Sequence, residues 1–155
     1  MKIAIASDHA GFELKKYFIE LLKGADLEVI DMGPEAYDPN DDYPEYIKKV
    51  ARYISEHNDP EEYRGVIIGG SGQGENICAN KYKHVRSVVI YCNDMISNEN
   101  MAKTTRQHNN ANVISFGARF IEQGNAFEVL KMWLDEKFTG DPRHVRRLSK
   151  IESEE

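Results

Sequence analysis

The chain has 155 residues, a net charge of −6 and two cysteines. This length suits one domain over residues 1–155, which can bury a core without disulfides. An acidic chain lacks the basic face that nucleic acids require, and no apolar stretch is long enough for a signal peptide or a membrane span. We therefore predict a cytoplasmic protein that binds neither nucleic acid nor membrane, with Cys78 and Cys92 reduced and buried.

Short β-branched runs alternate with amphipathic segments along the chain. We expect strands at 2–6, 27–31, 66–69, 87–91 and 113–116, and helices at 10–23, 45–57, 74–82, 95–107 and 121–138. Pro142 is expected to stop the last helix, and a short helix from about residue 143 then leads into an acidic tail. This alternation predicts an α/β fold, a Rossmann-like three-layer α/β/α sandwich with a five-stranded parallel sheet.

Ligands of such sheets bind beyond the carboxyl ends of the strands. Asp8 and His9 follow the first strand, Tyr43 ends the acidic loop after the second, and Arg119 follows the fifth. These residues are therefore candidates for one site. Asp8 suits a helix cap equally well, and the acidic loop at 35–42 either borders the site or is solvated.

The third strand runs into the sequence Gly-Gly-Ser-Gly-Gln-Gly-Glu at 69–75. Glycines let successive backbone N–H groups converge on an anion, and a helix N-terminus adds partial positive charge. A nucleotide-binding P-loop would continue with Lys, whereas this chain has Glu75. The loop is thus expected to stabilise a transient anion beside a proton-transferring Glu75, although an acid in a first helical turn can serve the helix dipole alone.

Two further groups of residues are candidates from the second half of the chain. His108 falls near the end of the fourth predicted helix, where it either stabilises the helix end or acts as acid and base near neutral pH. Arg143 and Arg147 are four residues apart, so they share a helical face on which two guanidinium groups can bind one phosphate. The competing interpretation is a solvated face paired with nearby acids. No histidine spacing suggests a metal site.

Taken together, seven short motifs resemble ribose-5-phosphate isomerase type B. They occur in order between residue 2 and about residue 151. The wider family includes galactose-6-phosphate and allose-6-phosphate isomerases. The motifs are Ser-Asp-His-Ala-Gly at 7–11, Asp-Tyr-Pro at 42–44, Gly-Gly-Ser-Gly-Gln-Gly-Glu at 69–75, Ala-Asn-Lys at 79–81, Arg-Gln-His-Asn-Asn-Ala-Asn at 106–112, Gly-Ala-Arg at 117–119 and Arg-His-x-x-Arg at 143–147.

The resemblance implies an aldose-ketose isomerase that interconverts ribose 5-phosphate and ribulose 5-phosphate through a cis-enediolate, without metal or cofactor. His108 would open the furanose ring, and Asp8 would shuttle a proton between the O1 and O2 hydroxyls. Glu75 would carry the proton between C2 and C1. Backbone N–H groups of the loop would hold the enediolate oxygens, and the loop residues concerned are Gly70, Ser71, Gly72, Gln73 and Gly74.

The resemblance also implies how the substrate is held. Ser71 and Asn109 would orient the open sugar. The phosphate would be clamped by His9, Arg119, Arg143 and Arg147. In the family, residues of two chains build each site at a dimer interface, so a homodimer is implied, which could assemble further into a dimer of dimers.

One departure and two alternatives accompany this assignment. Many family members use a cysteine as the carbon base at the position of Gly69, so this chain resembles the subgroup that uses a glutamate, here Glu75. A six-carbon substrate, allose or galactose 6-phosphate, is the first alternative. An NAD-binding Rossmann oxidoreductase is the more remote one, because Glu75 occupies the third glycine position of that fingerprint.

Overall fold

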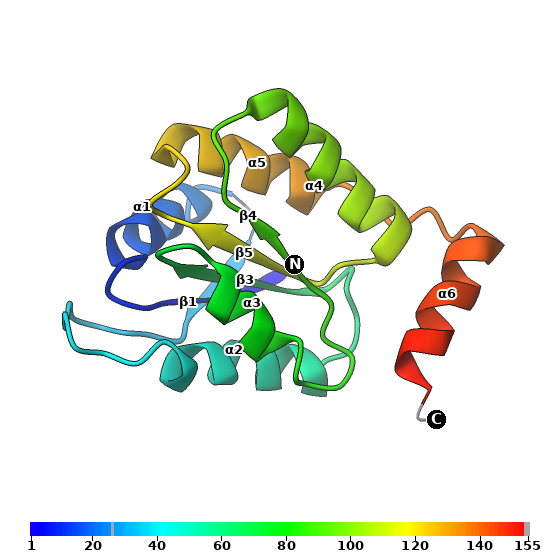
Figure 1. The fold of residues 1–155 in the computed structure, drawn as a ribbon, viewed down its shortest axis with the longest axis horizontal. Coiled ribbons are helices and arrows are strands. Elements are labelled where there is room, and N and C mark those ends of the chain that lie inside the picture. The colour runs from blue at the N-terminus through cyan, green and yellow to red at the C-terminus, as the bar shows by residue number, and fades with distance from the viewer. Residues whose placement is uncertain (26, 154–155) are drawn as a thin grey trace.

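A five-stranded parallel sheet forms the centre of the computed structural model, which describes residues 1–25 and 27–153 (Figure 1). The strand order is β2-β1-β3-β5-β4. The predicted α/β class and the parallel sheet are confirmed. The strands are β1 (Lys2–Ser7), β2 (Glu28–Asp31), β3 (Tyr63–Gly69), β4 (Ser87–Ile90) and β5 (Val113–Gly117).

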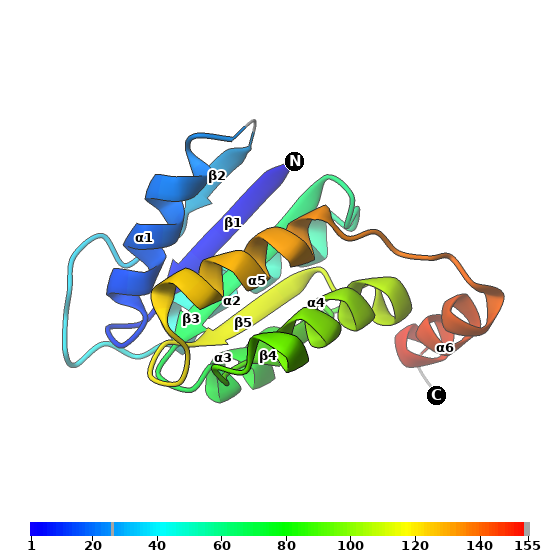
Figure 2. The ribbon, with the colours of Figure 1, turned by 90° about the horizontal axis from the view of Figure 1, so that it is seen from above.

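Helices cover both faces of this sheet. One face packs against α1 (Phe12–Leu22), α4 (Met95–Asn109) and α5 (Gln123–Asp135). The other face packs against α2 (Pro44–Glu56) and α3 (Gln73–Ala79), as Figure 1 shows. The last helix, α6 (Pro142–Glu152), stands apart from the sheet beyond the end of α4 (Figure 2).

The two-residue period of the strands assigns their side chains to two cores. In β1, Ile3 and Ile5 enter the core under α1 and α5, whereas Ala4 and Ala6 face α2. All four are fully buried. Burying each large aliphatic side chain stabilises the fold by about 1.5–3 kcal/mol, so the alternation in sequence fixes the faces of the strand.

Three details differ from the prediction. Strand β3 begins at Tyr63, three residues before the predicted start, because the buried Arg64 extends it. Helix α5 already ends at Asp135, so Pro142 does not stop it. Pro142 instead occupies the first turn of α6, where its missing N–H costs no hydrogen bond, and Asp141 caps that helix by accepting from the N–H of Arg143 at 2.9 Å. The acidic tail lies partly outside the described residues.

The two cysteines are free, as predicted, but each is only partly buried, so the prediction that they are buried is not met. Cys92 lies after β4, and its thiol donates to Oδ1 of Asn98 at 3.1 Å. Within the described residues, no helix combines the length and the apolar character that crossing a membrane requires.

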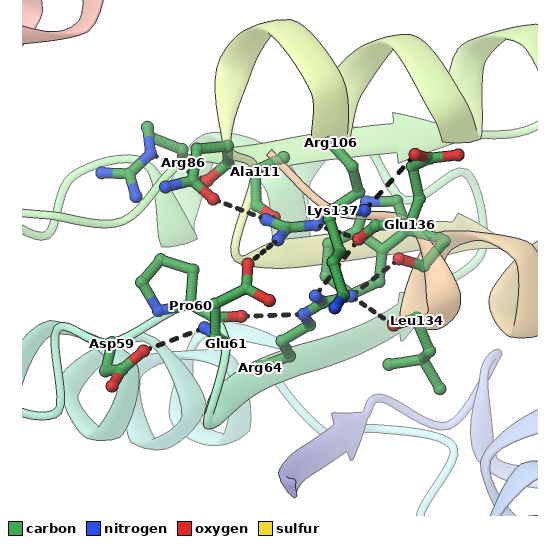
Figure 3. Close-up of polar contacts among 12 residues, drawn as sticks. Asp59, Pro60, Glu61, Arg64, Arg86, Arg106, Ala111, Leu134, Glu136 and Lys137 are labelled. Atoms are coloured by element: carbon green, nitrogen blue, oxygen red, sulfur yellow. Dashed lines mark hydrogen bonds and ion pairs between the residues drawn. The ribbon is translucent and has the colours of Figure 1, made fainter. Parts of the chain in front are cut away.

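Two buried arginines join β3, α4 and the end of α5 (Figure 3). Arg64 donates from Nη1 to the backbone carbonyls of Trp133 at 2.7 Å and Leu134 at 2.8 Å. Both guanidinium carbons lie over the Trp133 ring, at 5.3 Å for Arg64 and 5.8 Å for Arg106. The carbonyls at a helix C-terminus carry partial negative charge, so these cations act as a cap supplied by other elements.

Arg106 fastens the end of α4 through the same network. It donates from Nη1 to the carbonyl of Ala111 at 2.7 Å, from Nε to that of Glu136 at 3.2 Å and from Nη2 to Oε1 of Glu61 at 3.0 Å. Burial lowers the pKa of Arg106, and burial together with the nearby Arg106 lowers the pKa of Arg64 to about 10. The planar fork of arginine is what allows one side chain to serve so many acceptors.

We expect Arg106→Lys to lower the free energy of unfolding by at least about 2 kcal/mol, because a lysine leaves buried acceptors unpaired. Chemical denaturation measures this value. The control is Arg52→Lys, which makes the same change at an exposed position of α2 and should stay within about 0.5 kcal/mol of the parent. Equal stability of the two variants would show that Arg106 is replaceable by any cation.

Candidate active site

Most of the predicted site residues gather at the carboxyl edge of the sheet. Asp8 and His9 follow β1, the glycine loop of residues 70–74 follows β3, and Arg119 follows β5. The loop that precedes α2 adds Tyr43. We call these residues, together with Glu75, the first cluster. The N–H of Asp8 donates to the carbonyl of Ile68 at 3.2 Å, which continues the parallel pairing of β1 with β3 one residue beyond Ser7.

The carboxylate of Glu75 folds back over the end of β3. A β-carbon built on Gly69 would lie 2.0 Å from Oε1 of Glu75 and 2.1 Å from its Cδ, far inside van der Waals contact. Residue 69 must therefore be glycine for Glu75 to occupy this place. The same geometry explains the departure noted in the sequence: a side chain at residue 69 and this conformation of Glu75 compete for one volume.

Glu75 is nearly inaccessible, with 4% of its surface exposed. Burial raises its pKa, and the nearby Asp8 carboxylate raises it further, while the backbone N–H of Glu75 itself acts in the opposite direction. A carboxyl whose pKa is moved toward neutrality is better suited to both accept and return a proton. Asp8 also accepts from the N–H of Gly11 at 3.0 Å, but Gly11 precedes the first turn of α1, and no side chain among the described residues caps that helix, so the capping role that the sequence left open is not found.

Within the first cluster, the glycine loop contributes backbone N–H groups. Gly72 has a positive φ of 74°, which glycine adopts without strain, and its carbonyl accepts from the hydroxyl of Ser115 at 2.7 Å. Within the described part of the chain, the N–H groups of Ser71, Gly72 and Gly74 have no hydrogen-bond acceptor. The hydroxyl of Ser71 accepts from the N–H of Gln73 at 3.3 Å.

Two side chains border this loop closely. The guanidinium of Arg119 lies 3.3 Å from where a β-carbon on Gly70 would be. The phenol oxygen of Tyr43 lies 2.9 Å from the corresponding position on Gly74. The glycines thus let a cation and a phenol approach the backbone, which gives the loop a positively charged and hydrogen-bonding border.

A carboxylate that the sequence did not single out belongs to this cluster. Oδ1 of Asp41 lies 2.6 Å from Nδ1 of His9 and accepts from the N–H of His9 at 3.1 Å. The hydrogen bond to Asp41 raises the pKa of His9. Asp41 stands among several acids of the loop at 35–42, and no spacing within that loop distinguishes it from the others.

The remaining predicted residues form a second cluster at the amino edge of the sheet. His108 and Asn109 end α4, while Arg143 and Arg147 lie on α6. The His108 ring stacks on that of His144, with centroids 4.3 Å apart and an interplanar angle of 14°. Burial, followed by the charge of His108, lowers the pKa of His144. A histidine missed in the sequence therefore holds His108 in place.

Hydrogen bonds at both ends hold α6 near α4. Before the helix, the hydroxyl of Thr139 donates to the carbonyl of Gln107 at 2.9 Å. At its end, the carboxylate of Glu152 contacts Nδ1 of His84 at 2.9 Å and Nη1 of Arg86 at 2.8 Å. Neither end depends on the two candidate arginines of α6.

Arg143 and Arg147 remain exposed on this anchored helix. Within the described residues, the ion pair found for them joins Nε of Arg143 to Asp141 at 3.2 Å, in a setting where both side chains are largely solvated. An exposed pair of this kind contributes little to stability. The competing interpretation, a solvated face paired with nearby acids, is thus met by Asp141, and among these residues no ion pair joins either arginine to Asp135 or Glu136.

The two clusters lie at opposite edges of the sheet. Helix α4 starts after the carboxyl end of β4 and ends four residues before β5 begins, and its 15 residues span about 22 Å at 1.5 Å per residue. Figure 2 shows the strand arrowheads on one side of the molecule and α6 on the other. The glycine loop and His108 of the same chain therefore do not meet.

Comparison with known proteins places this arrangement in context. The family model described as Ribose/Galactose Isomerase matches residues 3–151. A putative sugar phosphate isomerase of Bacillus subtilis, YwlF, is 40% identical over 97% of this chain and 95% of that protein. A probable ribose-5-phosphate isomerase B of Mycoplasma genitalium is 38% identical over 96% of this chain and 92% of that protein.

Solved structures agree with these sequence matches. The crystal structure of ribose-5-phosphate isomerase B from Mycoplasma genitalium, with bound ribulose-5-phosphate, aligns with a TM-score of 0.89 at 37% identity, covering 97% of this chain and 93% of that one. The ribose-5-phosphate isomerase B of Clostridium thermocellum aligns with a TM-score of 0.87 at 36% identity, covering 98% and 95%. The fold and the sequence thus agree over nearly the full length of these proteins.

The close approach of Gly69 and Glu75 yields a structural prediction. Gly69→Ala should displace the Glu75 carboxylate and lower the free energy of unfolding by about 1–3 kcal/mol, the usual cost of overpacking. The control Gly124→Ala, in α5 with no atom within 4 Å of the new β-carbon, should stabilise the protein by about 0.5–1 kcal/mol. A crystal structure of Gly69→Ala with the carboxylate unmoved would contradict this account.

Proposed function

The chain belongs to the ribose/galactose isomerase family, and from this premise we propose that it interconverts ribose 5-phosphate and ribulose 5-phosphate. The observation that carries the proposal is the Glu75 carboxylate, buried at the rim of a loop of free backbone N–H groups. A base beside an anion-binding loop is the arrangement that proton abstraction next to a carbonyl requires.

In this proposal Glu75 removes the proton from C2 of the open aldose. The electron pair of the C–H bond forms a C1–C2 double bond, and the carbonyl oxygen gains negative charge, giving a cis-enediolate. Once the proton on O2 has moved to O1, returning the first proton to C1 gives the ketose, with its carbonyl at C2. The raised pKa of Glu75 supports this double role, because a carboxyl that holds a proton more tightly is better able to keep the proton taken from C2 until it is returned to C1. The proton moves between two carbons of one substrate, so the reaction needs no cofactor.

The remaining groups of the first cluster would serve the oxygen atoms of the intermediate. Asp8 is buried beside Glu75 and would move the proton between the O1 and O2 hydroxyls. The free N–H groups of the glycine loop would stabilise the developing oxyanion. Removing one donor of this kind typically raises the activation free energy by about 2.7–4 kcal/mol. Ser71 would orient the open sugar, and Tyr43 would close the site beside Gly74.

We infer that the second cluster acts on the substrate of a partner chain in a homodimer. His108 would protonate the ring oxygen to open the furanose, and Asn109 would orient the product of that step. Arg143 and Arg147 would bind the phosphate together with Arg119 and His9 of the first cluster. One chain holds these groups at opposite edges of its sheet, which supports a site shared between two chains.

The surface of α4 supports a particular way of pairing. Ser97, Met101, Thr104 and His108 recur at intervals of four, three and four residues, so they share one face of the helix. Two such faces packed antiparallel about a two-fold axis would bring the end of each α4 toward the start of the other. His108 of one chain would then approach the glycine loop of its partner.

Exposed apolar side chains beside this face add a second reason for pairing. Tyr91 and Phe120 are 47% and 53% exposed, and their rings contact edge to face with centroids 6.2 Å apart. Ile96, at the start of α4, is 76% exposed. Clustered apolar surface of this kind is typical of protein interfaces.

We further propose that the enzyme is cytoplasmic, because free thiols such as those of Cys78 and Cys92 persist in that reducing compartment.

A six-carbon sugar phosphate is the second candidate substrate, because the chemistry at C1 and C2 is the same and the family name includes galactose. The partner chain in our proposal sets the distance from Glu75 to the phosphate-binding arginines. Sugar length is therefore determined at the dimer interface, and an assay with ribose 5-phosphate, allose 6-phosphate and galactose 6-phosphate in parallel separates the two candidates.

We expect the purified protein to isomerise ribose 5-phosphate, and Glu75→Gln to lower kcat by at least about 10²-fold, the scale of a lost general base. The control is Glu13→Gln, which makes the same change in the first turn of α1, where Glu13 is exposed. Its kcat should stay within about twofold of the parent, as for surface substitutions. A Glu75→Gln variant that keeps nearly full kcat would contradict the assignment of the base.

A further inference from the structure

We propose that Asp41 is a positioning residue that holds His9 as an imidazolium aimed at the phosphate of the substrate. This inference rests on the proposed function, in which His9 is one of the phosphate ligands. Asp41 itself would not touch the substrate. Its effect would pass through His9, with which it makes two contacts across 32 positions of sequence.

The two contacts fix both the backbone and the ring of His9. Oδ1 of Asp41 accepts from the backbone N–H of His9 at 3.1 Å and lies 2.6 Å from its Nδ1. A carboxylate at that distance requires a proton on Nδ1, so the ring is oriented and Nε2 is left as the nitrogen that can meet a ligand. In the doubly protonated ring, Nε2 is a donor, which is what a phosphate oxygen accepts.

The burial of Asp41 gives this pair its energetic reason. Its side chain is only 2% exposed, whereas that of His9 is 28% exposed. The second oxygen, Oδ2, is buried without a hydrogen-bond partner among the described residues. A buried carboxylate of this kind is costly unless a cation compensates it, and His9 is the group placed to do so. Asp41 therefore favours the charged ring rather than merely tolerating it.

The other charged groups around His9 act in both directions. Asp8, on the same turn, favours the imidazolium, whereas burial and the nearby Arg119 disfavour it. The ring of Tyr37 meets the His9 ring edge-on, with the ring centroids 6.4 Å apart. The balance raises the pKa of His9, and the hydrogen bond to Asp41 is the largest contribution. Without that bond, burial becomes the largest contribution, and together with Arg119 it opposes Asp8, so the pKa of His9 should fall.

The sign of the functional effect follows from this balance. His9 binds a phosphate as a cation only below its pKa, so affinity should fall as the pH rises through that value. Because Asp41 raises the pKa of His9, it moves this loss of phosphate affinity to higher pH. The phosphate is largely dianionic above pH of about 7 because its second pKa is about 6. Above about pH 7 the charge of the phosphate therefore changes little. The charge of His9 is then what changes, and Asp41 moves that change to higher pH.

The test compares Asp41→Asn with Asp38→Asn. Both remove one negative charge from the same loop, but Asp38 is exposed, and its contact is to the N–H of Asn40, which an asparagine oxygen can also accept. The ring protons of His9 are titrated by NMR in each variant, with and without inorganic phosphate. KM and kcat for ribose 5-phosphate are measured from pH 6.5 to 9 in parallel.

In Asp41→Asn we expect the pKa of His9 to fall by at least about one pH unit, as when a histidine loses an adjacent carboxylate. KM at pH 8 should rise about fivefold or more while kcat stays within about twofold, because only binding of the phosphate weakens. Adding Asp41→Asn to His9→Gln should change KM no further, since the effect passes through His9. Asp38→Asn should match the parent in every measurement.

An unchanged pKa of His9 in Asp41→Asn would overturn the proposal, and so would an equal rise of KM in the His9→Gln background. A fall in kcat without a rise in KM would assign Asp41 to the chemical step instead and contradict it as well. The NMR titration with inorganic phosphate needs no catalysis. A protein without isomerase activity whose His9 still depends on Asp41 would therefore refute the proposed function and leave this inference standing.

Discussion

All five strands run in the same direction, so every helix between two strands must return the chain to the amino edge of the sheet. Helix α4 does this with His108 in its last turn, and α6 then extends the same edge with two exposed arginines. The glycine loop and its carboxylate lie at the opposite edge. No rotation of a side chain can bridge the length of α4, so the topology itself separates the two sets of groups and favours a second chain to reunite them.

The end of β3 shows a second constraint, which acts at atomic scale. The carboxylate of Glu75 fills the volume in which a side chain at residue 69 would lie. The resemblance to the family relates a cysteine at that position to a glutamate six residues later. The geometry gives this relation a physical basis, because a side chain at residue 69 and this conformation of Glu75 would occupy the same volume above the strand end. Only one of them fits at a time.

Patterns that depend on neighbours in sequence predicted much of the fold. Alternating aliphatic residues identified β1 and β5, and the glycine run with Glu75 identified the loop after β3. Contacts between distant segments were not accessible in this way. Asp41 is one acid among several in its loop, and its pairing with His9 arises only when that loop folds over the turn after β1. Arg64 and Arg106 likewise resemble surface charges until Trp133 and the end of α5 enclose them.

The sharing of one site between two chains is the central claim, and a heterodimer of two inactive variants tests it most directly. One chain carries Glu75→Gln and a first affinity tag, the other carries His108→Asn and a second tag, and the mixed dimer is purified through both. If sites are shared, one of its two sites has both intact residues, so activity should return to about half of the parent value per dimer. Recovery no greater than that of either homodimer would contradict a shared site.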